Sequence, residues 1–97
     1  PLCPCGLKFH GLRVSDPRLN QVTGEVLVKQ GTKTVPQLVR EALNKKNSIV
    51  HRLRVMDVLR RIWETSGPAP DFMDLSSLLL NRNERLRETT RRFFGHA

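Results

Sequence analysis

Arginine and lysine are the side chains with the clearest binding chemistry in this sequence, and they gather in two stretches. The stretch near the C-terminus holds five arginines within eleven positions: Arg82, Arg85, Arg87, Arg91 and Arg92. Arginine binds phosphate through two parallel N–H groups, and exposed phenylalanine rings can stack on unpaired bases. Glu84 and Glu88 lie three or four positions from some of these arginines and would pair with them. Because the arginines outnumber the glutamates, we expect this stretch to contact nucleic acid, with Phe93 packed in the core.

The second basic stretch lies where two predicted helices meet. The residues Thr34-Val35-Pro36-Gln37 resemble a capping box that starts a helix, and residues 44–47 predict a polar turn before the next helix. Together they outline a helix-turn-helix motif, which reads DNA through the start of its second helix. The candidate contact residues in this stretch are Lys45, Lys46, Asn47, His51, Arg52 and Arg54.

The same pattern also fits an ordinary antiparallel helix pair joined by a lysine-bearing loop. The turn lacks the glycine that helix-turn-helix motifs often contain. The second helix is apolar over much of its surface, whereas a recognition helix needs an exposed polar face. The sequence therefore leaves both interpretations open.

A metal site near the N-terminus is the third candidate. Cys3, Cys5 and His10 form C-x-C-x4-H, which supplies three of the four ligands that a structural zinc site needs. His51 or His96 would have to supply the fourth. The alternative is two free thiols in an irregular segment, and we expect that outcome, with no metal and no cofactor. Two cysteines so close together do not make a disulfide framework, which favours an intracellular, reducing compartment.

Catalysis has little support in the sequence. There is no tyrosine, no glycine-rich phosphate loop and no nucleophile motif. Asp71 and Asp74 lie three positions apart, but capping and the helix dipole explain them at a predicted helix start. We expect a protein that binds and is not an enzyme.

Composition limits the partner class. The 97 residues are enough for one domain, with 38% hydrophobic and 27% charged residues and a formal net charge of +8. Such an excess of positive charge is typical of proteins that bind polyanions. No apolar run is long enough to span a bilayer. The chain begins with Pro1, so we expect it to be part of a longer chain, with residues 1–6 irregular.

A central helix must position these side chains. The stretch from Ser48 to Gly67 has apolar residues at helical spacing over more than half of its circumference, so it should be surrounded by protein. Ser48 or Asn47 can cap its start, and Gly67 followed by Pro68 should end it. The charged residues on its remaining strip include pairs four positions apart, which favour a partly self-paired surface.

The flanking elements are predicted from the same signals. Residues 7–14 and 25–30 read as two strands of a hairpin, although residues 17–23 could hold a helical turn. After the central helix, Asp71 can cap a last helix from Phe72 towards Phe94. The face of that helix would carry Phe72, Leu75, Leu79, Leu86 and Phe93. Arg82 interrupts this face, and Asn81 and Asn83 are weak helix formers, so the helix could break near them.

The prediction is therefore a mostly α, three-helix domain over residues 1–97, preceded by a short β-hairpin or irregular N-terminal segment. Its predicted function is nucleic-acid binding through a basic helical surface, with RNA slightly favoured over DNA and a larger ribonucleoprotein as one setting. The alternative is a helical protein-interaction or oligomerisation module whose last helix docks onto an acidic or apolar partner.

Overall fold

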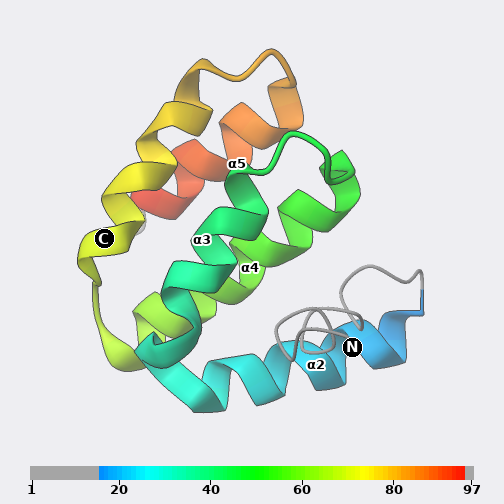
Figure 1. Cartoon of the computed structure of the whole chain (residues 1–97), viewed down its shortest axis with the longest axis vertical. Coiled ribbons are helices and arrows are strands. Elements are labelled where there is room, and N and C mark those ends of the chain that lie inside the picture. The colour runs from blue at the N-terminus through cyan, green and yellow to red at the C-terminus, as the bar shows by residue number, and fades with distance from the viewer. Residues whose placement is uncertain (1–15, 96–97) are drawn as a thin grey trace.

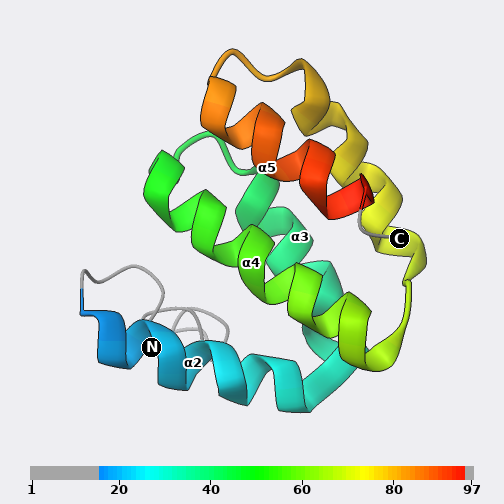
Figure 2. The ribbon, with the colours of Figure 1, turned by 180° about the vertical axis from the view of Figure 1, so that it is seen from behind.

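Helix α4, Ile49–Ser66, lies at the centre of the fold, and most of the other elements pack against it (Figures 1 and 2). The structure is a computed structural model that describes residues 16–95. The elements in chain order are α2 (Pro17–Gln30), the 3-10 helix η1 (Gly31–Thr34), α3 (Val35–Leu43), α4 (Ile49–Ser66), the 3-10 helix η2 (Pro70–Leu80) and α5 (Glu84–Gly95). The described residues form helices and no strands, which confirms the mostly α prediction.

The predicted central helix is confirmed at both ends. Ser48 is its N-cap, and the Ser48 Oγ accepts a hydrogen bond from the His51 backbone N–H at 3.1 Å. Gly67 follows the last turn with a φ of 86°, a left-handed value that favours glycine. The side chains of Val55, Leu59 and Ile62 are fully buried, as a helix surrounded by protein requires.

The strand predicted at residues 25–30 is wrong, because this stretch is the second half of α2. Asp16 caps the helix, its Oδ1 accepting from the Arg18 N–H at 2.9 Å, and Pro17 occupies the first turn. Gly24 and Leu27 are buried against the rest of the protein. Packing on α4 outweighs the β propensity of the valines in this stretch. The other predicted strand, residues 7–14, lies outside the described residues, as do residues 1–6.

The chain enters α3 without the predicted capping box. Thr34 makes no capping hydrogen bond; its hydroxyl donates instead to the carbonyl oxygen of Gly31 at 3.1 Å. The 3-10 helix η1 runs directly into α3, so a helical turn, and not a capping side chain, precedes the first backbone N–H groups of α3. Pro36 in the first turn still marks the start of the helix, as predicted.

The single helix predicted after the central one is two elements, η2 and α5. The chain does break at residues 81–83, the alternative that the sequence left open: the Asn81 Oδ1 accepts from the Asn83 N–H at 2.8 Å, and the Asn83 Oδ1 accepts from the Leu86 N–H at 3.1 Å. Asp71 does not cap, because η2 begins one residue before it and Ala69 is the N-cap.

The inward face of η2 follows the 3-10 period. Phe72, Leu75 and Leu78 are buried at every third position, whereas Leu79, predicted on this face, is 39% exposed. A 3-10 helix has three residues per turn, so every third side chain lies on the same side. From α5, Leu86 and Phe93 complete the core, and Phe93 packs there as predicted.

An aromatic cluster joins the end of α4 to η2 and α5. Trp63 stacks on Phe72 with ring centroids 5.1 Å apart, and Phe93 meets both rings edge-on at 5.1 and 5.2 Å. Phe94 packs on Phe93 at 5.2 Å. This cluster fixes α5 against α4, and thereby fixes where the arginines of α5 lie.

Candidate nucleic-acid interface

The turn between α3 and α4 holds three of the predicted contact residues in a defined geometry. The Asn44 Oδ1 accepts from the Lys46 N–H at 2.9 Å, and the Asn47 Nδ2 donates to the Glu41 carbonyl at 2.9 Å. Lys45 and Lys46 are exposed between these two fixed points. Asn47 shapes the turn through its side-chain hydrogen bond to Glu41. Figures 1 and 2 both show this turn beside the start of α5.

Arg52 lies one turn into α4 and is buried, with 4% of its surface exposed. Its Nε donates to the Ala42 carbonyl at 2.7 Å, which satisfies one of the open carbonyls in the last turn of α3. Burial lowers the pKa of the Arg52 guanidinium from its usual range. An arginine nevertheless remains protonated at neutral pH, so the positive charge is held inside the protein.

A pocket of about 690 Å³ opens beside Arg52. It lies between the α3–α4 turn and the end of η2. Its lining residues are Leu43, Lys45, Arg52, Ser77, Leu78, Leu80, Asn81 and Arg82. Three cationic side chains from separate parts of the sequence thus meet around one cavity, and no carboxylate is among the described residues that line it. We call Lys45, Lys46, Arg52 and Arg82 the basic corner.

His51, a candidate contact residue, is also buried, at 2% exposed. Its Nε2 lies 3.0 Å from the Glu41 Oε1, so it joins α4 to α3. With both His51 and Arg52 buried, the start of α4 does not present them on an open helix face. A DNA-reading motif would also place Val50 in its core, whereas Val50 is 50% exposed. The pair α3–α4 therefore matches the ordinary helix pair better than a DNA-reading motif.

The arginines of α5 divide between its two sides. Arg85 and Arg92 face α4, since each lines a pocket together with α4 side chains. Arg87 lies on the opposite side, where its Nη1 donates to the Asn81 carbonyl at 3.2 Å. Arg91 follows Arg87 by four positions and so shares its side. The five clustered arginines of the sequence therefore do not form one continuous surface.

The exposed strip of α4 and the side of α5 beside it, which we call the α4–α5 seam, are largely self-neutralised. Arg61 lies where this strip borders α2. The Asp57 carboxylate lies 3.0 Å from Arg60 and 3.4 Å from Arg61, and Arg60 also lies 3.5 Å from Glu64. These pairs confirm the expected self-paired strip. On α5, the Arg92 Nη2 lies 3.7 Å from the Glu88 Oε1. Exposed pairs of this kind contribute little stability, but they reduce the charge available to a partner.

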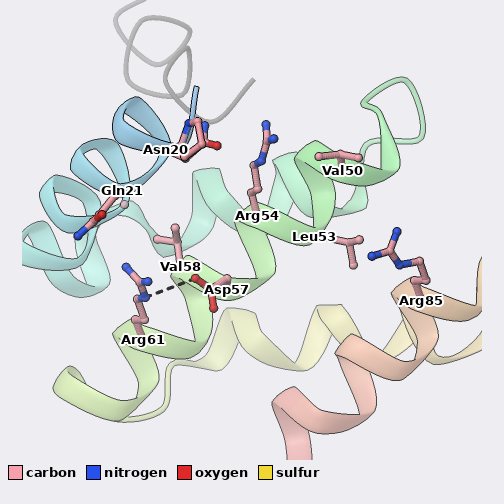
Figure 3. Close-up of a pocket in the computed structure, with 11 residues that line it drawn as sticks. Asn20, Gln21, Val50, Leu53, Arg54, Asp57, Val58, Arg61 and Arg85 are labelled. Carbon is pink, nitrogen blue, oxygen red and sulfur yellow. Dashed lines mark ion pairs between the residues drawn. The ribbon is translucent and has the colours of Figure 1, made fainter. Parts of the chain in front are cut away.

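A second groove, of about 500 Å³, lies between α2, α4 and α5 (Figure 3). It is lined by Arg54, Arg61 and Arg85 together with apolar and amide side chains of α2 and α4. In Figure 3, the ion pair between Arg61 and Asp57 lies at the α4 wall. The carboxylate within this groove distinguishes it from the pocket at the basic corner.

Sequence reasoning missed three residues that shape the corner pocket: Ser77, Leu80 and Asn81. The sequence marks Asn81 only as a weak helix former. Leu80 is 89% exposed, and its place at the end of an apolar run is the one available signal. The sequence assigns none of the three to a site, since the pocket exists only where η2 meets the α3–α4 turn.

The candidate metal site of the sequence falls largely outside the part of the chain that the structure describes. Cys3, Cys5, His10 and His96 lie outside the described residues, and within residues 16–95 no group of three or more His, Cys, Asp or Glu could hold a metal ion. No helix in that range has both the length and the apolar character to cross a bilayer.

Comparisons of the chain with protein-family models, curated proteins and solved structures found no match.

Proposed function

We propose that this chain is a non-enzymatic nucleic-acid-binding domain whose main contact surface is the basic corner. The observation that carries the proposal is the convergence of Lys45, Arg52 and Arg82 around one pocket without a carboxylate in its described lining. Like charges repel, so three cations held together favour an anionic partner. The net charge of +8 would attract a polyanion from solution.

The corner is favoured over the α4–α5 seam because of charge balance. Along the seam, Arg60, Arg61 and Arg92 already have carboxylate partners within 4 Å. At the corner, Lys45 and Arg82 are exposed and have no ion pair within the described residues. A phosphate backbone gains most from cations that are not already paired. Arg87 and Arg91, which share one side of α5, would extend the contact onto that helix.

RNA is slightly favoured over DNA. A duplex reader needs an exposed recognition helix, and the start of α4 has His51 and Arg52 buried. A concave pocket suits the splayed phosphates and bases of a single strand, which is the usual target of RNA-binding proteins. The phenylalanines of α5 are packed with Trp63, so stacking on Phe93 is not part of the proposal.

The test is binding of labelled single strands and duplexes, in RNA and DNA, across a salt series. The wild-type chain should bind with log affinity falling linearly against log salt. The variant Lys45→Gln/Lys46→Gln/Arg82→Gln should flatten the slope by about 0.7 for each single-strand phosphate that it no longer binds. The control Lys29→Gln/Lys33→Gln changes lysines of α2 and η1, outside the corner, and should keep the wild-type slope.

Two outcomes would contradict the proposal. If the folded wild-type chain does not bind any strand at low salt, nucleic-acid binding is wrong. If Arg85→Gln/Arg91→Gln/Arg92→Gln flattens the slope and the corner variant does not, the contact surface is α5 and the corner assignment is wrong.

A protein-interaction module is the second candidate. One face of α2 exposes Leu19, Val22 and Val26, at 46%, 56% and 49%. Their spacing places them on one helical stripe, which could meet the same stripe of a second copy. Sedimentation of nucleic-acid-free protein at increasing concentration distinguishes this candidate, because self-association would appear without any strand.

A further inference from the structure

The corner pocket combines a buried cation with two exposed ones. Arg52 lines the pocket and is held by the 2.7 Å hydrogen bond from its Nε to the Ala42 carbonyl. That carbonyl is the only acceptor of the Arg52 side chain among the described residues, so the two terminal nitrogens of the guanidinium have no acceptor there. Lys45 and Arg82 approach from the turn and from the η2–α5 connection.

A buried guanidinium without a carboxylate is a costly arrangement. Burial penalises a charge unless an opposite charge or several hydrogen bonds compensate it. One backbone carbonyl compensates part of this cost at Arg52. An anion between Arg52, Lys45 and Arg82 would compensate the rest and relieve the repulsion among the three cations.

We infer that this pocket binds a phosphate monoester, as found at the end of a nucleotide or of a nucleic-acid strand. The charge balance favours a monoester, which carries about −1.5 to −2 at neutral pH, over the single negative charge of a backbone diester. The burial of Arg52 also favours a terminal phosphate. A backbone phosphate has a sugar on each side, so it reaches a buried guanidinium less easily.

The apolar part of the pocket favours a nucleotide over a bare phosphate ion. Leu43, Leu78 and Leu80 line it beside the cations, and Leu80 is highly exposed. A volume of about 690 Å³ lies in the range of small-ligand sites and leaves room beyond a phosphate group. The planar, weakly polar face of a base would cover leucine side chains that otherwise meet water. The choice of a nucleotide source rests on the proposed function, whereas phosphate binding itself rests on the three cations.

The experiment is calorimetric titration of the full chain with adenosine 5′-monophosphate, adenosine and inorganic phosphate. The monophosphate should bind, and adenosine should bind far more weakly. The variant Lys45→Gln/Arg82→Gln changes only exposed side chains and should weaken binding of the monophosphate by about tenfold to a hundredfold, as expected when charge-assisted hydrogen bonds are removed. The control Lys29→Gln/Lys33→Gln has the same net charge and should bind like the wild type.

Strands with a 5′-phosphate or a 5′-hydroxyl distinguish the two sources. A preference for the phosphorylated strand that is absent in the corner variant assigns the pocket to strand ends. Equal binding of both strands, with the monophosphate still bound at the pocket, assigns it to free nucleotides. Either result supports the inference.

Three further results separate this inference from the proposed function. If the monophosphate does not bind, or binds the corner variant as well as the wild type, the pocket is not a monoester site, although salt-dependent strand binding can persist. If a phosphoserine peptide binds more tightly than the monophosphate, the nucleotide assignment is wrong. If the monophosphate binds and no strand does, the pocket stands and the proposed function falls.

Discussion

The Nε of Arg52 donates to the carbonyl oxygen of Ala42 at 2.7 Å, which joins the first turn of α4 to the last turn of α3 across ten positions of sequence. The bond holds the side chain in place, and a charged group remains buried beside the corner pocket. It also satisfies a helix-terminal carbonyl that has no partner within its own helix. Arg52 is thus a structural residue and a candidate ligand-binding residue together.

Replacing Arg52 with methionine should destabilise the fold by at most about 1.5–3 kcal/mol, the usual contribution of a hydrogen bond to a charged group, because the change also removes the burial cost of the guanidinium. Methionine keeps much of the apolar stem and leaves the Ala42 carbonyl without its donor. Urea denaturation measures the free energy of unfolding. Arg91→Met, at an exposed position of α5, is the control and should change it by about 0.5 kcal/mol or less. Equal stability of the two variants would show that the bond contributes no more than the burial of the charge costs.

Gly24 of α2 tests the contact between α2 and α4. A Cβ added there would lie 3.5 Å from the Val58 Cγ2 and 3.6 Å from the Arg61 Nη1, which are ordinary contacts. Gly24→Ala should therefore raise the free energy of unfolding by about 0.5–1 kcal/mol through the helix propensity of alanine. Gly24→Leu should lower it by about 1–3 kcal/mol, because the longer side chain overpacks this face. A decrease in stability in the alanine variant would contradict the spacing between the helices.

Ser48 tests the start of the central helix. Ser48→Ala should lower the free energy of unfolding by about 0.5–2 kcal/mol, because the His51 N–H no longer has its acceptor. Ser48→Asp supplies another acceptor and a charge that suits the helix N-terminus, so it should retain most of the stability. Thermal denaturation followed by circular dichroism compares the two. If both variants are destabilised equally, the capping bond is not the cause.

The aromatic cluster predicts unequal effects at two neighbouring positions. Phe93→Leu should cost about 1.5–3 kcal/mol, because Phe93 is buried and meets Trp63 and Phe72 edge-on, and such pairs contribute about 0.5–1.5 kcal/mol each. Phe94→Leu should cost less, because Phe94 is only partly buried and lies 6.4 Å from Trp63. Trp63 is the single tryptophan of the chain, so its fluorescence reports unfolding of this cluster directly. A larger destabilisation by Phe94→Leu than by Phe93→Leu would contradict the deeper burial of Phe93.

The elements that the sequence predicts well are those whose signals are local. The central helix combines a serine cap, a terminal glycine and a wide apolar arc, and it begins and ends within one residue of the predicted limits. The break at residues 81–83 is favoured by asparagines that do form side-chain turns. In both cases the determining hydrogen bonds join residues within four positions of each other.

The elements that the sequence predicts poorly depend on distant packing. Val26 and Val28 favour a strand by propensity, but Leu27 and Gly24 are buried in a helix because α4 provides the surface that they cover. On η2, Leu78 replaces Leu79 in the core because the segment is a 3-10 helix, a period that the apolar pattern alone does not distinguish over two turns.

The helical class, the central helix and the excess of positive charge follow from the sequence alone, because composition, caps and periodicity are properties of neighbouring residues. Which of the charges are available to a partner depends on the tertiary structure. The fold pairs the cations of the α4–α5 seam, divides the arginines of α5 between two sides, and buries Arg52 beside Lys45 and Arg82. The physical reason is that a charge is neutralised or exposed by the groups around it in space, and those groups come from helices far apart in the chain.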